Sequence, residues 1–219
     1  MAMAQVKHNF SRQHFWAARY FADKALEIEQ TINNADDKNI KSIHRSYVTG
    51  AIISIVAGLE SSINELYLEA CDNNRNTLRG LTENAIEMLA EWWEEVKLCP
   101  ILLKYQTALL LTFKEKFDPG GQPYQDIDGL IYLRNALVHY KPEWDSELQV
   151  HKKLRNRLES KFELNPFAAE NSLWFPHRCL GSGCAKWAVK VSKIFITLTP
   201  PSHREHISST RFIKSDLSI

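Results

Sequence analysis

Along most of the chain, hydrophobic positions recur every three or four residues, the spacing that places them on one face of an α-helix. The clearest case is a stripe with alternating steps of four and three: Ile52, Val56, Leu59, Ile63, Leu66 and Ala70. Helices are predicted on this basis over 10–32, 38–70, 82–96, 100–117, 125–140, 147–164 and 184–198. The pattern predicts an all-α protein built as a helical bundle.

The polar and irregular stretches agree with these boundaries. The clearest loop is Asp118–Pro123, which contains two prolines and two glycines. The helix over 125–140 is expected to stop near Tyr140, because Lys141 precedes a proline and is disfavoured in helical geometry. We expect a single domain over 1–219, with a loosely held polar tail over about 202–219.

Composition is that of an ordinary soluble globular protein, with 44% hydrophobic and 24% charged residues. The formal net charge is +1, so any binding of nucleic acid must depend on a local basic surface. The most apolar stretch, Ala51–Leu59, has roughly half the length that a membrane helix needs, and the first residues lack the apolar core of a signal peptide. We therefore expect a cytoplasmic protein without membrane association.

The sharpest chemical feature is Arg134-Asn135, then three residues, then His139, near the end of a predicted helix. The motif resembles that of the HEPN superfamily, in which an arginine and a polar residue precede a histidine on a late helix of a bundle. Glu60 and Asn64, on a long helix upstream, are also similar to the family, and the resemblance covers roughly residues 40–200.

The resemblance implies a HEPN-type bundle with additional C-terminal helices. It also implies a metal-independent endoribonuclease that acts as a homodimer, in a toxin or phage-defence role, with an antitoxin or another regulatory protein as a possible partner. Some HEPN toxins carry a tyrosine two residues after the histidine, and a partner nucleotidyltransferase modifies it. Here Tyr140 follows His139 directly, which argues against that regulation and favours core packing or ring stacking for Tyr140.

The angular spacing of residues around an α-helix determines which motif residues can share one face. Asn135 and His139 are four residues apart and share a face, whereas Arg134 and His139 lie about 140° apart around the helix. Two copies packed antiparallel through this helix would bring arginine and histidine into one cleft. Histidine can act as base or acid near neutral pH, and arginine grips phosphate oxygens, so the set suits 2′-OH attack that leaves a 2′,3′-cyclic phosphate.

Other interpretations stay open. His139 can serve simply as a cap at a helix C-terminus, with Arg134 as a surface charge. The alternative to the ribonuclease is a non-catalytic helical module that dimerises and docks a partner protein.

A basic run follows the motif, and its candidate RNA-binding residues, with Lys141, are Lys152, Lys153 and Arg155. The other interpretation of this run is a solvated helix face. We expect no cofactor and no metal site, because His177, Cys179 and Cys184 have no familiar zinc spacing.

Overall fold

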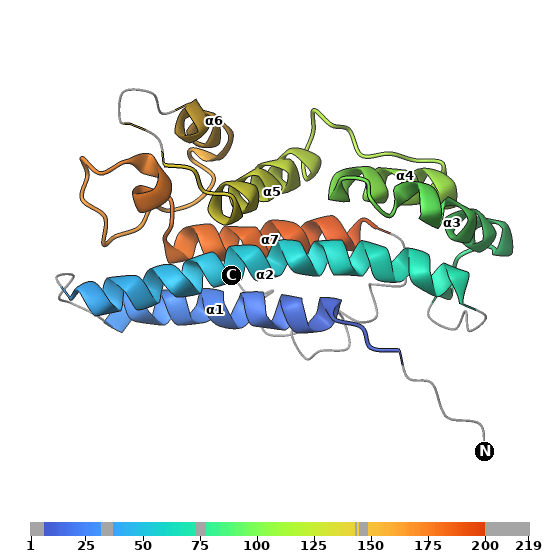
Figure 1. The fold of residues 1–219 in the computed structure, drawn as a ribbon, viewed down its shortest axis with the longest axis horizontal. Helices are drawn as coiled ribbons and strands as arrows, with labels where there is room; N and C mark the ends of the chain where they lie inside the picture. The colour runs from blue at the N-terminus through green and yellow to red at the C-terminus, as the bar shows by residue number, and fades with distance from the viewer. Residues whose placement is uncertain (1–6, 32–36, 73–77, 143, 145–148, 200–219) are drawn as a thin grey trace, which may run out of the picture. The chain divides into compact units, whose positions relative to one another are not determined.

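The structure, a computed structural model, describes residues 7–31, 37–72, 78–142, 144 and 149–199. Within these ranges it contains helices and no strand, which confirms the all-α prediction (Figure 1). The elements are α1 (Ser11–Thr31), α2 (Lys38–Cys71), α3 (Glu83–Val96), α4 (Ile101–Phe113), α5 (Tyr124–Val138), α6 (Gln149–Leu158), η2 (Trp174–Arg178) and α7 (Ser182–Thr197).

The described chain gathers into two compact units, which are considered separately. Unit 1 contains residues 7–14, 57–72, 78–116 and 199, and unit 2 contains residues 15–31, 37–56, 117–142, 144 and 149–198. Helix α2 contributes residues to both. That the whole chain forms one domain stays a prediction, and the expected tail over 202–219 lies outside the described residues.

Helix α2 is built around the apolar stripe seen in the sequence. All six stripe residues, from Ile52 to Ala70, are at most 2% exposed. Within the described part of the chain, α2 is the one helix long and apolar enough to cross a membrane. Half of its most apolar window is buried inside the protein, as in the core helix of a soluble protein, so this is weak evidence for a membrane span.

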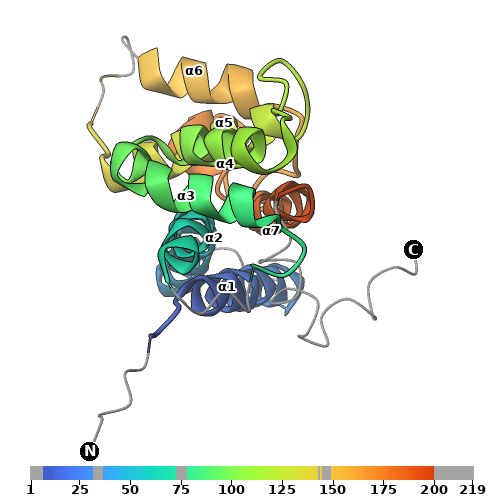
Figure 2. The same ribbon diagram turned by 90° about the vertical axis from the view of Figure 1, so that its right-hand side faces the viewer.

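In unit 1, α3 and α4 lie side by side (Figure 2). Thr82 caps α3 by accepting a hydrogen bond from the backbone N–H of Ala85 at 3.2 Å. The buried Lys104 of α4 donates from Nζ to Oδ1 of Asn64 on α2 at 2.8 Å, and burial lowers the pKa of this lysine. Asn64, one of the residues behind the family resemblance, therefore has a structural role in this unit.

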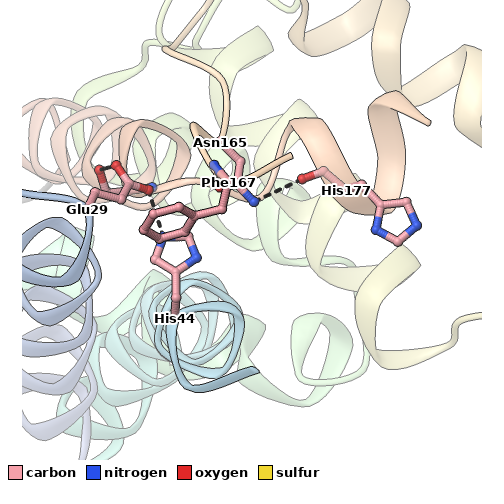
Figure 3. A network of polar contacts seen from close by, with 6 residues as sticks. Glu29, His44, Asn165, Phe167 and His177 are labelled. Carbon is pink, nitrogen blue, oxygen red and sulfur yellow. Dashed lines mark hydrogen bonds and ion pairs between the residues drawn. The ribbon is translucent and has the colours of Figure 1, made fainter. Parts of the chain in front are cut away.

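In unit 2, a largely buried carboxylate connects α1, α2 and α7 (Figure 3). Glu29 of α1 accepts from Nε2 of His44 at 2.7 Å, and from the backbone N–H and Oγ of Ser182 at 2.7 and 2.5 Å. The Phe167 ring meets the His44 imidazole edge to face, with 5.1 Å between the ring centroids. Glu29 thus satisfies donors at the first turn of α7, where the backbone N–H groups lack partners within the helix.

Helix α5 packs against both α6 and α7 in unit 2. Two carboxylates near the start of α5 pair with cations that follow along the chain: Asp128 with Arg157, and Asp126 with Lys161 at 2.6 Å. Gly129 allows a close approach of the Leu158 side chain, since a Cβ there would lie 2.9 Å from Leu158 Cδ2. These contacts hold α6 against α5.

The sequence-based boundaries differ from the structure at two helix ends. Helix α4 ends at Phe113 instead of near Phe117, because the backbone turns left-handed at Lys114, with φ 61°. Helix α6 ends at Leu158 instead of near residue 164, with a second left-handed residue at Ser160. The Phe162 ring, predicted to continue α6, contacts two tryptophans, Trp174 and Trp187.

Candidate functional site

The motif lies on the last turn of α5. His139 is the residue that ends this helix, with the non-helical angles φ −108° and ψ 38°. Its backbone N–H still donates to the carbonyl of Asn135 at 2.9 Å, so the two motif residues remain one turn apart. Both are exposed to solvent. His139 thus combines a backbone position fixed by the helix end with an accessible side chain.

A pocket of about 260 Å³ opens beside this turn within unit 2. Its residues come from α5, from the segment that follows α5, and from α6 and η2. The lining residues are Tyr132, Asn135, Ala136, His139, Tyr140, Lys141, His151 and Phe175. The volume is slightly below the range of roughly 300–1,000 Å³ that is usual for small-molecule sites.

The pocket contains some of the residues singled out from the sequence and leaves out others. Asn135, His139 and Lys141 line it, whereas Arg134 does not. This division follows the helical period, which turns Arg134 away from the face that Asn135 and His139 share. Arg134 is partly buried in its own chain.

The three predicted RNA-binding residues of α6 lie outside the pocket lining. Lys152 and Lys153 are exposed. Arg155 is also exposed, and its guanidinium donates from Nε and Nη2 to Glu159 at 2.9 and 2.7 Å. The basic run is therefore partly compensated by acidic neighbours, and its freely presented charge is concentrated at Lys152 and Lys153.

Sequence reasoning missed His151 as a site residue. This histidine belongs to the first turn of α6, is 7% exposed and lines the pocket. Its ring meets Phe175 edge to face at 5.1 Å between centroids. The available signal was a histidine at the start of the basic run, but the run was interpreted only as charge.

Tyr140 has a different environment from the expected one. The prediction of core packing is wrong, because Tyr140 is 48% exposed. The prediction of ring stacking is closer, since its ring lies 6.1 Å from that of Phe175, tilted by 46°. Tyr140, Phe175 and Tyr132 give the pocket three aromatic walls.

His177, which does not line the pocket, forms a polar contact with Arg45 in unit 2. Nη2 of Arg45 donates to Nδ1 of His177 at 2.7 Å, which fits a neutral imidazole. Burial first, and then the nearby Arg45 and His151, lower the pKa of His177. The backbone carbonyl of His177 accepts from Nδ2 of Asn165 at 3.2 Å (Figure 3). Over the described residues, no group of three or more His, Cys, Asp or Glu side chains is arranged to hold a metal ion.

Comparison of the chain with protein-family models, with curated proteins and with solved structures gives no match. Any inference about function must therefore start from the residues that line the pocket. Two imidazoles, one amide and one ammonium group meet three aromatic rings there, and no carboxylate lines the pocket. Such a set suits an anionic ligand with a flat ring, with histidine available to move protons.

Proposed function

We propose that this protein is a metal-independent endoribonuclease of HEPN type, with His139, Asn135 and Arg134 as its catalytic residues. The observation that carries the proposal is that Asn135 and His139, one turn apart at the end of α5, are both exposed and line one pocket together with Lys141. An RNA phosphodiester supplies both features that this pocket suits, an anionic phosphate and flat bases.

The chemistry needs no external nucleophile. The ribose 2′-oxygen attacks phosphorus, the bond from phosphorus to the 5′-oxygen breaks, and the products carry a 2′,3′-cyclic phosphate and a 5′-hydroxyl. One proton leaves the 2′-OH and one reaches the departing 5′-oxygen, so a group that titrates near neutrality is required. His139 supplies an imidazole in the pocket. In this proposal, Lys141 and Asn135, which line the same pocket, bind the phosphate oxygens.

Arg134 enters this proposal through a second copy of the chain. Because Arg134 does not line the pocket of its own chain, we infer that the enzyme is a homodimer in which Arg134 of one protomer serves the site of the other. Isologous pairing is the commonest assembly of soluble proteins. The guanidinium would stabilise the charge that develops on the phosphate.

The decisive experiment is an RNA cleavage assay in excess EDTA. Purified protein is incubated with a labelled RNA oligonucleotide, and the products are analysed by mass spectrometry for cyclic phosphate ends. We expect cleavage to survive EDTA, and the same oligonucleotide with 2′-O-methyl groups to stay intact because it lacks the nucleophile. The His139→Ala variant should lose roughly 10²–10⁴-fold in rate.

A matched control replaces another histidine. His14→Ala changes a partly exposed histidine on α1 that does not line the pocket, and it should leave the rate unchanged. Parental activity in His139→Ala would show that the motif is not the active site. Absence of cleavage in the parental protein would favour the other function considered, a non-catalytic module that docks a partner protein.

We further propose a toxin or phage-defence role in the cytoplasm, with RNA as substrate and an antitoxin or other regulatory protein as partner. An enzyme that cuts cellular RNA restrains growth, so its expression should halt the growth of host cells. Expression of His139→Ala to the same level should not. Equal growth arrest by both proteins would contradict this role.

A further inference from the structure

His151 is a buried polar residue with no evident role in stabilising the fold. It is 7% exposed, and its Nδ1 is fully buried with no hydrogen-bond partner among the described residues. An unsatisfied buried polar atom is destabilising by roughly 1–3 kcal/mol, so its presence in a native protein calls for an explanation. The same residue lines the pocket that contains His139.

Packing restricts the movement of this imidazole. Leu154 and Leu158, on the same helix as His151, are fully buried and anchor α6. The edge-to-face contact with Phe175 restricts the ring itself. A group held in this way meets the geometric requirement for proton transfer better than a mobile surface side chain does.

Resting on the proposed ribonuclease function, we propose that His151 is a second catalytic residue, which together with His139 forms an acid–base pair within one chain. His151 takes the proton from the 2′-OH as the base. His139 gives a proton to the 5′-oxygen as the acid. One proton is taken and one is delivered, so the reaction balances without metal or water. The pair is then restored by exchange of protons with solvent.

The assignment of the two roles follows from position. His139 is the exposed residue at the end of α5, so the acid role beside the departing strand is assigned to it. His151 is buried in the wall of the same pocket, so the base role is assigned to it. Other titratable or charged groups face or adjoin His151: Tyr132, Tyr140, Lys141, Lys152, Arg155 and His177.

The test compares two RNA substrates that differ at one atom. In the second substrate sulfur replaces the bridging 5′-oxygen at the cleavage site, and a thiolate departs without protonation. On normal RNA, both His139→Ala and His151→Ala should lose roughly 10²–10⁴-fold in rate. On the sulfur substrate, His139→Ala should regain most of the parental rate and His151→Ala should not.

The dependence of rate on pH provides an independent readout. The parental enzyme should show a bell-shaped profile, and the His151 variant should lose the limb on which the rate rises with pH. A second variant, His151→Gln, keeps a polar side chain if the alanine variant is unstable, and circular dichroism checks folding in both. His177→Asn is the matched control, because His177 does not line the pocket, and it should keep the bell shape.

The outcomes distinguish the proposed role of His151 from the ribonuclease proposal on which it rests. If the parental protein and His151→Gln cleave alike while His139→Ala is inactive, the ribonuclease stands and the role of His151 is overturned. If the sulfur substrate rescues His151→Ala, or fails to rescue His139→Ala, the acid–base assignment is overturned. If the parental protein does not cleave RNA, the ribonuclease proposal falls, and this role falls with it.

Discussion

Glu29 shows how one side chain can carry opposing electrostatic effects. Burial raises the pKa of this carboxyl group, but hydrogen bonds from His44 and Ser182 outweigh burial and lower the pKa below its ordinary value of 4.5. The carboxylate is therefore favoured in the folded protein relative to the unfolded chain. Its contribution to stability is fully present above pH 4.5 and is lost as the pH falls through the lower folded-state value.

Replacing Glu29 by Gln is expected to lower the free energy of unfolding at neutral pH by roughly 1–3 kcal/mol, because an amide cannot accept all three hydrogen bonds. The difference from the parental protein should narrow as the pH falls from 4.5 through the lower folded-state pKa, because the parental carboxylate becomes protonated over that range. Urea unfolding at several pH values measures both effects. Glu27→Gln, on the exposed face of the same helix, should change little. A difference that does not depend on pH would contradict this account of Glu29.

The residues of the candidate site were predictable only where they share a helix. Asn135 and His139 are four positions apart, so the helical period alone brings them to one face. His151 reaches the same pocket from another helix, and its place depends on the packing of α6 against α5, which no local pattern in the sequence encodes. Tyr140 is half exposed, although its aromatic ring suggested a place in the core.

Two glycines at the start of α7 bring it close to the segment after α6. A Cβ at Gly183 would lie 2.6 Å from the carbonyl oxygen of Glu163, and one at Gly181 would lie 2.7 Å from Cα of Asn165. Backbone atoms cannot rotate away as a side-chain end can. A larger residue at either glycine must therefore push the two segments apart.

Gly183→Ala is expected to lower the free energy of unfolding by roughly 1–3 kcal/mol through this overpacking. Gly129→Ala is the matched control, because the close atom there is a terminal methyl of Leu158, which can rotate. Thermal unfolding of the two variants should therefore show a clearly larger loss for Gly183→Ala. A larger loss for Gly129→Ala would mean that the approach of α6 to α5, not the start of α7, is the tighter constraint.

Helix α6 is expected to guide RNA toward the pocket through Lys152 and Lys153. Replacing both by Ala should weaken RNA binding and reduce the slope of log affinity against log salt by about 1–2, since each lost phosphate contact releases about one counterion fewer. Filter binding across salt concentrations measures this. Arg155→Ala should have a smaller effect, because Glu159 already engages that guanidinium.

A double variant of equal charge serves as the control. Lys186→Ala/Lys190→Ala removes two exposed cations from α7, which does not contribute to the pocket, and should leave the slope nearly unchanged. Equal effects of the two double variants would mean that binding follows overall charge and that α6 has no special role.

Most helices were predictable because their apolar stripes are long. Helix α2 was found almost to the residue, since its six stripe positions all enter the core. Helix α6 was predicted too long because local propensity does not reveal that Phe162 leaves the helix to pack between Trp174 and Trp187. The short η2 element was missed because it follows no repeating pattern.

A single chain does not bring all three motif residues into one pocket, which bears on the assembly of the protein. Arg134 does not line the pocket, and three large apolar side chains near the end of α5 are strongly exposed: Val138 at 49%, Tyr140 at 48% and Trp144 at 81%. Exposed apolar residues at one place often mark an interface. We therefore expect a homodimer with α5 at or near the two-fold axis, and light scattering measures its mass.

Complementation between variants tests both the dimer and the division of the site. Arg134→Ala and His139→Ala chains are co-expressed with different tags and purified through both. Such a heterodimer should recover about half of the parental activity, because one of its two sites is intact. A heterodimer of His139→Ala and His151→Ala should stay inactive, because neither chain holds both histidines. A monomeric mass, or recovery in the second pair only, would contradict this arrangement.

The position of His139 directly after the last residue of α5 has a practical consequence. Its backbone N–H holds the helix end whatever the side chain, so an alanine there should fold normally and keep the pocket open. A chain that binds its substrate without cutting it acts as a trap. Ultraviolet crosslinking of His139→Ala in growing cells, followed by sequencing of the attached RNA, would then identify the natural target directly.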